Sequence, residues 1–185
     1  KSGLQSTRTR SPFGSVVAPT YYVTGNHEWA AHAVQELEPL LEENGVHVLS
    51  NTYVMLERGE DKIALLGAED SNGYADQKTI AELSEEVRQE QGDVYKILLS
   101  HRNTRIEEYV DAHIDLTLCG HAHGGLIRLP GTDGLIGPHR EFFPSYTAGL
   151  YDLPYGQLVA SRGLGNQFPA FRLFNRPDVP VVVLE

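Results

Sequence analysis

Apolar residues recur along the chain at two spacings, one typical of helices and one typical of strands. Helical spacing predicts helices over 30–44, 77–91 and 103–112. β-type apolar runs predict strands over 21–24, 94–99, 115–119, 157–160 and 180–184. Two further runs, 52–57 and 62–66, flank Arg58-Gly59-Glu60-Asp61 and predict a hairpin. The mixture of the two patterns indicates a layered α/β fold.

Two residues bear on the first predicted helix. Pro39 lies inside it and lacks the N–H of a helical hydrogen bond, so a kink or a break into two short helices is expected. Gly45 follows the last apolar position, where glycine commonly ends a helix because it adopts left-handed backbone angles without strain.

Histidine follows shortly after three of the predicted strands. His27 follows 21–24, His101 follows 94–99, and the run Gly120-His121-Ala122-His123-Gly124-Gly125 follows 115–119. Ligands of α/β sheets bind beyond the carboxyl ends of strands. Residues two apart in an extended segment point to the same side, so both rings of the His-x-His pair are expected to face one cavity. Imidazole is the commonest metal ligand, which indicates a metal site; two solvated loop histidines are the alternative.

The other four histidines are expected to be structural or solvated, and they are His32, His47, His113 and His139.

Composition narrows the class of protein. A chain of 185 residues is one domain by length, and 41% hydrophobic residues suffice for a core. A net charge of −10 argues against nonspecific binding to nucleic acid or to a membrane surface, because both are anionic. The sequence contains no run of about 18 apolar residues, so it predicts no membrane span. The single cysteine, Cys119, is expected to be a small buried residue of its strand.

Five segments in order carry a resemblance to a known family. They are Gly25-Asn26-His27-Glu28, Ser100-His101, the segment 120–125, the segment 156–165 and Asn175-Arg176-Pro177. From about Val16 to the C-terminus the chain resembles the calcineurin-like metallophosphoesterases, and in particular their YkuE-like bacterial branch. The resemblance implies a sandwich of two mixed β-sheets flanked by helices, with the family's N-terminal strands lacking here.

The resemblance also implies roles for individual residues. Family enzymes hold two divalent ions bridged by a hydroxide. Asn26, His101 and His121 match the ligands of one ion, and His123 matches a ligand of the other. His27 matches the histidine that contacts the phosphate and assists the leaving group. The implied reaction is hydrolysis of a phosphomonoester or phosphodiester by metal-bound hydroxide, and the donor atoms suit Mn, Fe, Zn or Co.

The chain departs from the family before residue 25. The family's Asp-x-His and Gly-Asp-x-x-Asp motifs, which complete the first metal's shell and bridge both ions, are absent from 1–24. Without a bridging carboxylate two close dications repel each other, so one ion and impaired activity are expected for this chain. Residues 1–15 are expected to form a linker or an ill-defined segment and 16–185 the domain. Missing strands would leave an open sheet edge, which favours a homodimer or strand exchange.

Arg162 is a candidate for binding the substrate phosphate, with a salt bridge as the alternative. Arg102 is either a phosphate contact or a surface residue. The glycine-rich loop 129–146 carries Phe142 and Phe143, which either meet a lipid-like substrate or pack as a small hydrophobic cluster.

The expected partner is a phosphate-ester small molecule or a lipid-linked substrate, in a bacterial cytoplasm or at a membrane. The alternatives to an active phosphoesterase are a catalytically inactive metal-binding fragment or partner-binding module, and a different metal hydrolase such as an amidase.

Overall fold

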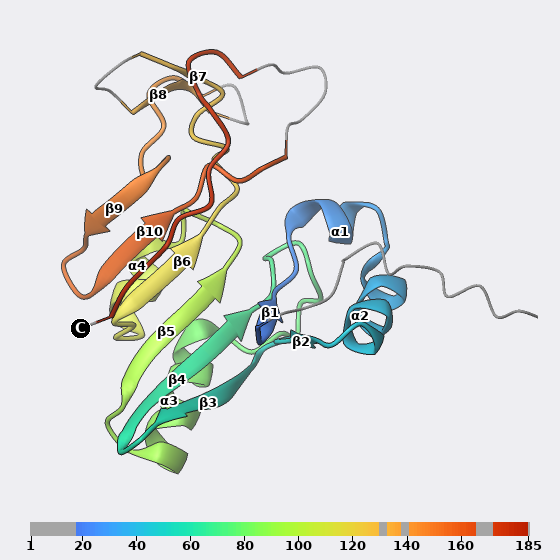
Figure 1. Cartoon of the computed structure of the whole chain (residues 1–185), viewed down its shortest axis with the longest axis vertical. Coiled ribbons are helices and arrows are strands. Elements are labelled where there is room, and N and C mark those ends of the chain that lie inside the picture. The colour runs from blue at the N-terminus through green and yellow to red at the C-terminus, as the bar shows by residue number, and fades with distance from the viewer. Residues whose placement is uncertain (1–17, 130–132, 138–140, 166–171, 185) are drawn as a thin grey trace, which may run out of the picture.

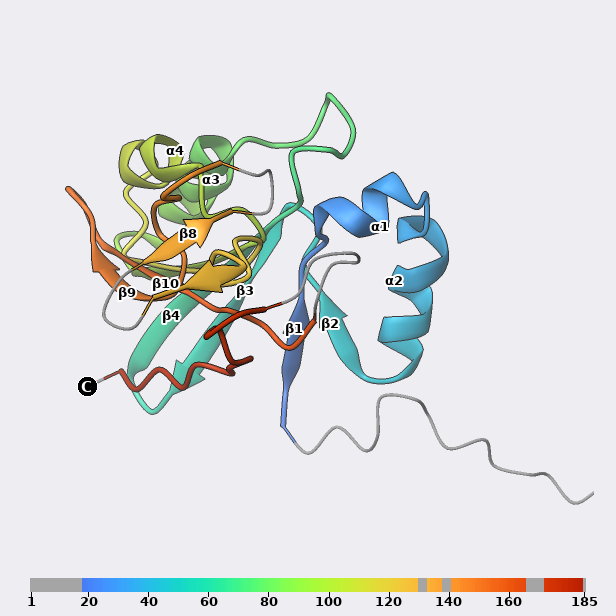
Figure 2. The same ribbon diagram turned by 90° about the horizontal axis from the view of Figure 1, so that it is seen from above.

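The computed structural model describes residues 18–129, 133–137, 141–165 and 172–184, and it confirms the α/β prediction. The predicted segment 1–15 lies outside the described residues. A six-stranded mixed sheet forms the body of the chain, and α3 (Ile80–Gln91) and α4 (Ile106–Asp111) cover one of its faces (Figures 1 and 2). A pair of parallel strands with two short helices lies beside the sheet.

The large sheet has the strand order β3-β4-β5-β6-β10-β9. Four central strands run parallel to one another, and an antiparallel strand closes each edge. The bounds are β3 Thr52–Arg58, β4 Asp61–Ala68, β5 Tyr95–Ser100, β6 Leu116–Cys119, β9 Gly149–Asp152 and β10 Gln157–Ala160. The predicted hairpin is therefore β3–β4, with Gly59 at a φ of 66° in its turn.

The core lies mainly between the sheet and α3 and α4. Leu66, Leu98 and Leu158 come from three strands and are fully buried against the helices, where they meet Val87 and Tyr109. Apolar residues fall on the inner face of α3 at helical spacing, as the sequence predicts. This packing fixes the carboxyl ends of β4, β5 and β6 at one edge of the molecule, because parallel neighbours end on the same side.

The smaller layer beside the sheet packs against part of the opposite face. β1 (Thr20–Tyr22) pairs in parallel with β2 (Val46–Val48), and Tyr21 and Val23 pack on a second cluster that includes Leu65 and Ile97. In the described part of the chain β1 pairs with β2 only, so pairing of its outer edge with another copy stays a prediction.

β7 (Ile127–Arg128) and β8 (Gly134–Ile136) form a separate two-stranded layer above the ends of β6 and β10 (Figure 1).

The prediction of one helix over 30–44 is wrong at its N-terminal end. The structure has α1 (Asn26–Ala30) and α2 (Val34–Glu43), with a break between them where His32 has a φ of 54°. Pro39 lies inside α2 instead of at the break. The residue is exposed, so water can replace the hydrogen bond that proline cannot donate. Gly45 follows α2 with a φ of 80°, as expected.

The strand predicted over 180–184 is also wrong. This segment runs along the sheet but does not pair with any strand. Val181 and Val183 are 87% and 75% exposed. Its β-branched residues favour an extended chain, but Pro180 has no N–H to donate to a neighbouring strand.

Among the described helices, none combines the length and the apolar character needed to cross a membrane.

Replacing Leu98 by Ala should lower the free energy of unfolding by about 2–5 kcal/mol, because the side chain is fully buried in the central strand β5. Urea unfolding followed by circular dichroism measures the change. Leu150→Ala is the matched control, since the same atoms are removed from a side chain that is 62% exposed. Equal losses in both variants would contradict the assignment of the core.

Candidate metal centre

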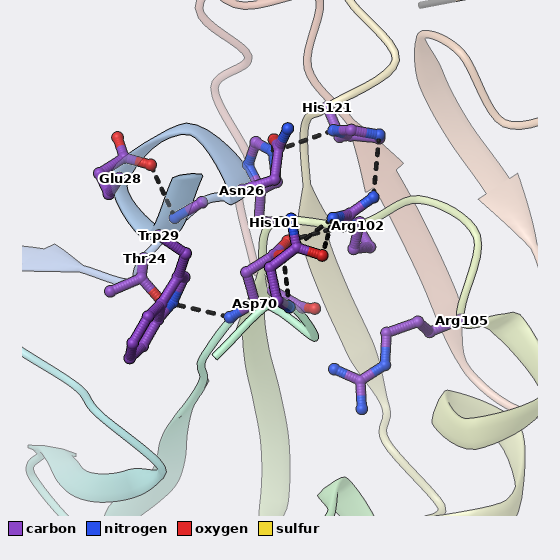
Figure 3. A network of polar contacts seen from close by, with 12 residues as sticks. Thr24, Asn26, Glu28, Trp29, Asp70, His101, Arg102, Arg105 and His121 are labelled. Carbon is purple, nitrogen blue, oxygen red and sulfur yellow. Dashed lines mark hydrogen bonds and ion pairs between the residues drawn. The ribbon is translucent and has the colours of Figure 1, made fainter. Parts of the chain in front are cut away.

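Three polar side chains meet at the edge where β5 and β6 end (Figure 3). His101 directly follows β5, His121 lies two residues after β6, and Asn26 begins α1. The Nε2 atom of His101 lies 2.7 Å from Oδ1 of Asn26 and 3.0 Å from Nδ1 of His121. The structure therefore brings together the three residues that the family resemblance assigns to one ion.

Glycine makes the approach of α1 to His101 possible. A Cβ atom at Gly25 would lie 3.1 Å from ring atoms of His101 and 2.9 Å from the carboxylate of Glu28. Glu28 accepts a hydrogen bond of 3.1 Å from the main-chain N–H of Gly25, which caps the start of α1. The carboxylate of Glu28 is thus engaged at the helix start.

The spacing of the three donor atoms suits a shared cation. Two ligands bound at about 2.1 Å and at right angles lie about 3 Å apart. A neutral imidazole carries only one N–H, so Nε2 of His101 can donate to Asn26 or to His121 but not well to both. Within the described residues no group of three or more His, Cys, Asp or Glu side chains is placed to hold a metal ion. The amide oxygen of Asn26 is what brings this set to three ligands.

Burial favours the neutral form of the central imidazole, His101. Loss of solvent lowers the pKa of His101, and the charges of Arg102 and His123 lower it further against the opposing effects of Asp70 and Glu28. A neutral imidazole is the form that binds a metal ion.

A buried ion pair that sequence reasoning missed supports this cluster. The guanidinium of Arg102 donates from Nε and Nη2 to the Asp70 carboxylate at 2.6 and 2.9 Å, and Nη1 lies 3.4 Å from Nε2 of His121. The Asp70 side chain is completely buried, and that of Arg102 is 14% exposed. Asp70 lies two residues beyond β4, so the position of a carboxylate at a strand end was the signal in the sequence.

This pair rules out the interpretation of Arg102 as a freely solvated surface residue, and its contact with a phosphate stays a prediction. Burial alone raises the pKa of Asp70, but the hydrogen bonds from Arg102 and Asn72 and the nearby positive charges outweigh it. The pKa of Asp70 is therefore held below its ordinary value.

The segment after β6 differs from the extended conformation that the sequence predicts. His121 and His123 have φ angles of 61° and 50°, and Gly124 and Gly125 continue in the same left-handed region. Consecutive left-handed residues form a tight turn, so the rule that residues two apart share a side does not apply. Ala122 is turned into the interior and is 2% exposed.

His123 has surroundings of its own. Its Nδ1 atom lies 3.3 Å from Nη2 of Arg172, and its carbonyl oxygen accepts a 2.6 Å hydrogen bond from Nδ2 of Asn175. Burial lowers the pKa of His123, and the charges of Arg172 and His27 lower it further. His27 is exposed at the start of α1 and lies close enough to His123 for their charges to repel.

Arg162 forms the salt bridge that was the alternative interpretation of this residue. Its Nε donates to Asp178 at 2.7 Å, and its main-chain N–H donates to the same carboxylate at 2.9 Å. Its predicted role in substrate binding stays a prediction. Cys119 is buried, which raises the pKa of its thiol to about 12 and makes a thiolate ligand unfavourable.

Of the remaining histidines, His47 stacks on Tyr21 and His113 lies edge-on to Tyr155. His32 is exposed in the break between the first two helices. His139 lies outside the described residues.

Comparison with known proteins gives a consistent set of relatives, although no family model matches the chain. The metallophosphoesterase YkuE of Bacillus subtilis (strain 168) is 27% identical over 181 residues, which cover 96% of this chain and 58% of that protein. YkoQ of the same organism, also a metallophosphoesterase by name, is 30% identical over a segment that covers 86% of this chain and 57% of YkoQ. The phosphodiesterase YaeI of Escherichia coli (strain K12) is 28% identical over a segment that covers 90% of this chain and 58% of YaeI. The chain thus spans less than two thirds of the length of these relatives.

Replacing Asp70 by Asn should lower the free energy of unfolding by about 3 kcal/mol or more, because the guanidinium of Arg102 would lose its buried counter-charge. Thermal and urea unfolding measure the loss. Glu85→Gln is the control, since its ion pair with Arg88 lies on the surface and its removal should leave the unfolding midpoint nearly unchanged.

The same pair predicts a dependence on pH. The folded-state pKa of Asp70 is lowered from the ordinary 3.8, so its stabilisation is present above that pH and is lost as the pH falls through the folded-state pKa. The difference in unfolding free energy between the wild type and Asp70→Asn should therefore shrink below about pH 4. A difference that stays constant to pH 2 would contradict the charged pair.

Proposed function

Because the chain belongs to the metallophosphoesterase family, we propose that it is a metal-dependent phosphoesterase, which hydrolyses a phosphomonoester or a phosphodiester. The observation that carries the proposal is the convergence of Asn26, His101 and His121 over 2.7 and 3.0 Å. An amide oxygen and two imidazoles suit Mn, Fe, Zn or Co.

We assign Asn26, His101 and His121 to one ion and His123 to a second ion, as the family resemblance implies. Bound ions would supply Lewis acidity and lower the pKa of a coordinated water. The chain's own residues orient the ligands: Arg102 contacts the outer nitrogen of His121 at 3.4 Å, and Asp70 fixes that guanidinium.

We propose that His27 holds and delivers the proton that the leaving oxygen needs. It is exposed at the start of α1, next to the ligand Asn26 and within reach of the electrostatic field of His123. A histidine in this position can pass a proton to an alkoxide as it forms.

We further propose that this chain by itself holds one ion tightly and the second weakly. The two carboxylates beside the described ligands are already engaged, Glu28 with the N–H of Gly25 and Asp70 with Arg102. Neither is available to bridge two cations and offset their repulsion. The same observation favours the second candidate function, a metal-binding module without turnover, for this chain.

We expect the chain to bind about one equivalent of Mn²⁺ or Co²⁺, and His101→Ala and His121→Ala to weaken that binding by about 100-fold or more, since each removes a direct ligand. Isothermal titration calorimetry measures both quantities. His113→Ala removes an exposed imidazole elsewhere and should bind metal as the wild type does. Equal affinity in all four proteins would refute the metal site.

The variant His27→Ala separates an enzyme from a metal-binding module. Turnover of an alkyl phosphodiester with added Mn²⁺ should fall by about 10²–10⁴-fold, because His27 protonates the leaving alkoxide. Turnover of bis(p-nitrophenyl) phosphate should fall much less, because p-nitrophenolate leaves without a proton, and metal affinity should stay the same. Loss of the wild-type turnover on chelation with EDTA, and its recovery on adding metal, completes the test. A wild-type chain that binds metal without any turnover would establish the second candidate function.

A further inference from the structure

Arg172 places a partly buried guanidinium beside His123. Its Nη2 atom lies 3.3 Å from Nδ1 of His123 and donates to the carbonyl oxygens of Arg162, at 2.7 Å, and Gly165. Its Nε and Nη1 atoms are buried from solvent and have no hydrogen-bond partner in the described structure. Three N–H groups of a cation are therefore left unpaired next to a residue assigned to the second ion.

The surroundings of Arg172 carry more positive than negative charge. Asp178 is the carboxylate that acts on it, and Asp178 is already bonded to Arg162 through Nε and the main-chain N–H. Two guanidinium groups thus share one carboxylate in the described part of the chain. Burial lowers the pKa of Arg172, and the neighbouring charge of Arg162 adds to this effect.

Buried polar groups in folded proteins are nearly always hydrogen-bonded, so an unpaired guanidinium beside a metal ligand needs an explanation. A bound anion would pair with these donors, since a phosphate group has several acceptor oxygens and arginine is well suited to bind them. Arg102 is a poorer candidate because its Nε and Nη2 atoms are bonded to Asp70. Arg162 is a poorer candidate because its Nε is bonded to Asp178.

We propose that Arg172 binds the phosphate group of the substrate through its Nε and Nη1 donors, beside His123, after a change of side-chain position that brings these buried donors into contact with the substrate. The inference rests on the proposed function and assigns to Arg172 the part that the sequence suggested for Arg162. The two carbonyl groups that hold Nη2 limit the positions that the guanidinium can take, which lowers the entropic cost of binding the phosphate.

Binding of inorganic phosphate to the Mn²⁺-loaded chain tests the proposal by isothermal titration calorimetry. Arg172→Gln should raise the dissociation constant for phosphate at least tenfold and leave that for Mn²⁺ within twofold. Arg172→Lys keeps the charge but loses two of the donors, so it should give an intermediate value. Arg88→Gln removes an exposed arginine on α3 and should match the wild type in both constants.

Two outcomes would overturn the proposal. One is unchanged phosphate affinity in Arg172→Gln with a lowered melting temperature, which would mean that Arg172 only ties the carbonyls of Arg162 and Gly165 together. The other is a wild-type chain that binds Mn²⁺ but not phosphate, which would leave the metal site intact. If Arg172→Gln does not fold, unchanged phosphate affinity in Arg172→Lys overturns the proposal instead.

Discussion

The buried ion pair between Asp70 and Arg102 is the constraint on which the geometry of the site depends. The Asp70 carboxylate is removed from water and accepts two hydrogen bonds from one guanidinium. Its main-chain N–H donates to the Thr24 hydroxyl, which also accepts from Trp29 of α1 (Figure 3). The end of β4, the residue after His101 and the first helix are thereby joined. Since either charge alone would be costly to bury, the three segments hold one another in place.

The fold delivers these groups to one place because β4, β5 and β6 are parallel neighbours. Asp70, His101 and His121 each lie within two residues of the end of a different strand. The core packed between these strands and α3 and α4 fixes the strand ends, and the strand ends fix the polar groups. Asn26 comes from the other layer, so the cluster also joins the two layers of the molecule.

The features of the fold and the site that depend on local sequence could be predicted, whereas those that depend on contacts between distant residues could not. Local apolar spacing was sufficient for α3, α4 and the strands of the large sheet other than β9, and placement at strand ends indicated that His101 and His121 meet. Asp70 was overlooked because its partner lies 32 residues away and nothing in the local sequence specifies that pairing. The left-handed turn at His121 and His123 was also missed, since non-glycine residues adopt it only where tertiary contacts compensate for the strain.

The site consists of two halves that are supported by different parts of the chain. Asn26, His101 and His121 are fixed by strand ends and by the buried ion pair, all within residues 20–121. His123 is held by the segment that returns near the C-terminus, through Asn175 on its carbonyl oxygen and Arg172 on its ring. These supports come from 49 and 52 residues further along the chain. Losing them would disturb the second half and leave the first in place, so the metal affinities that we propose for the two halves need not change together.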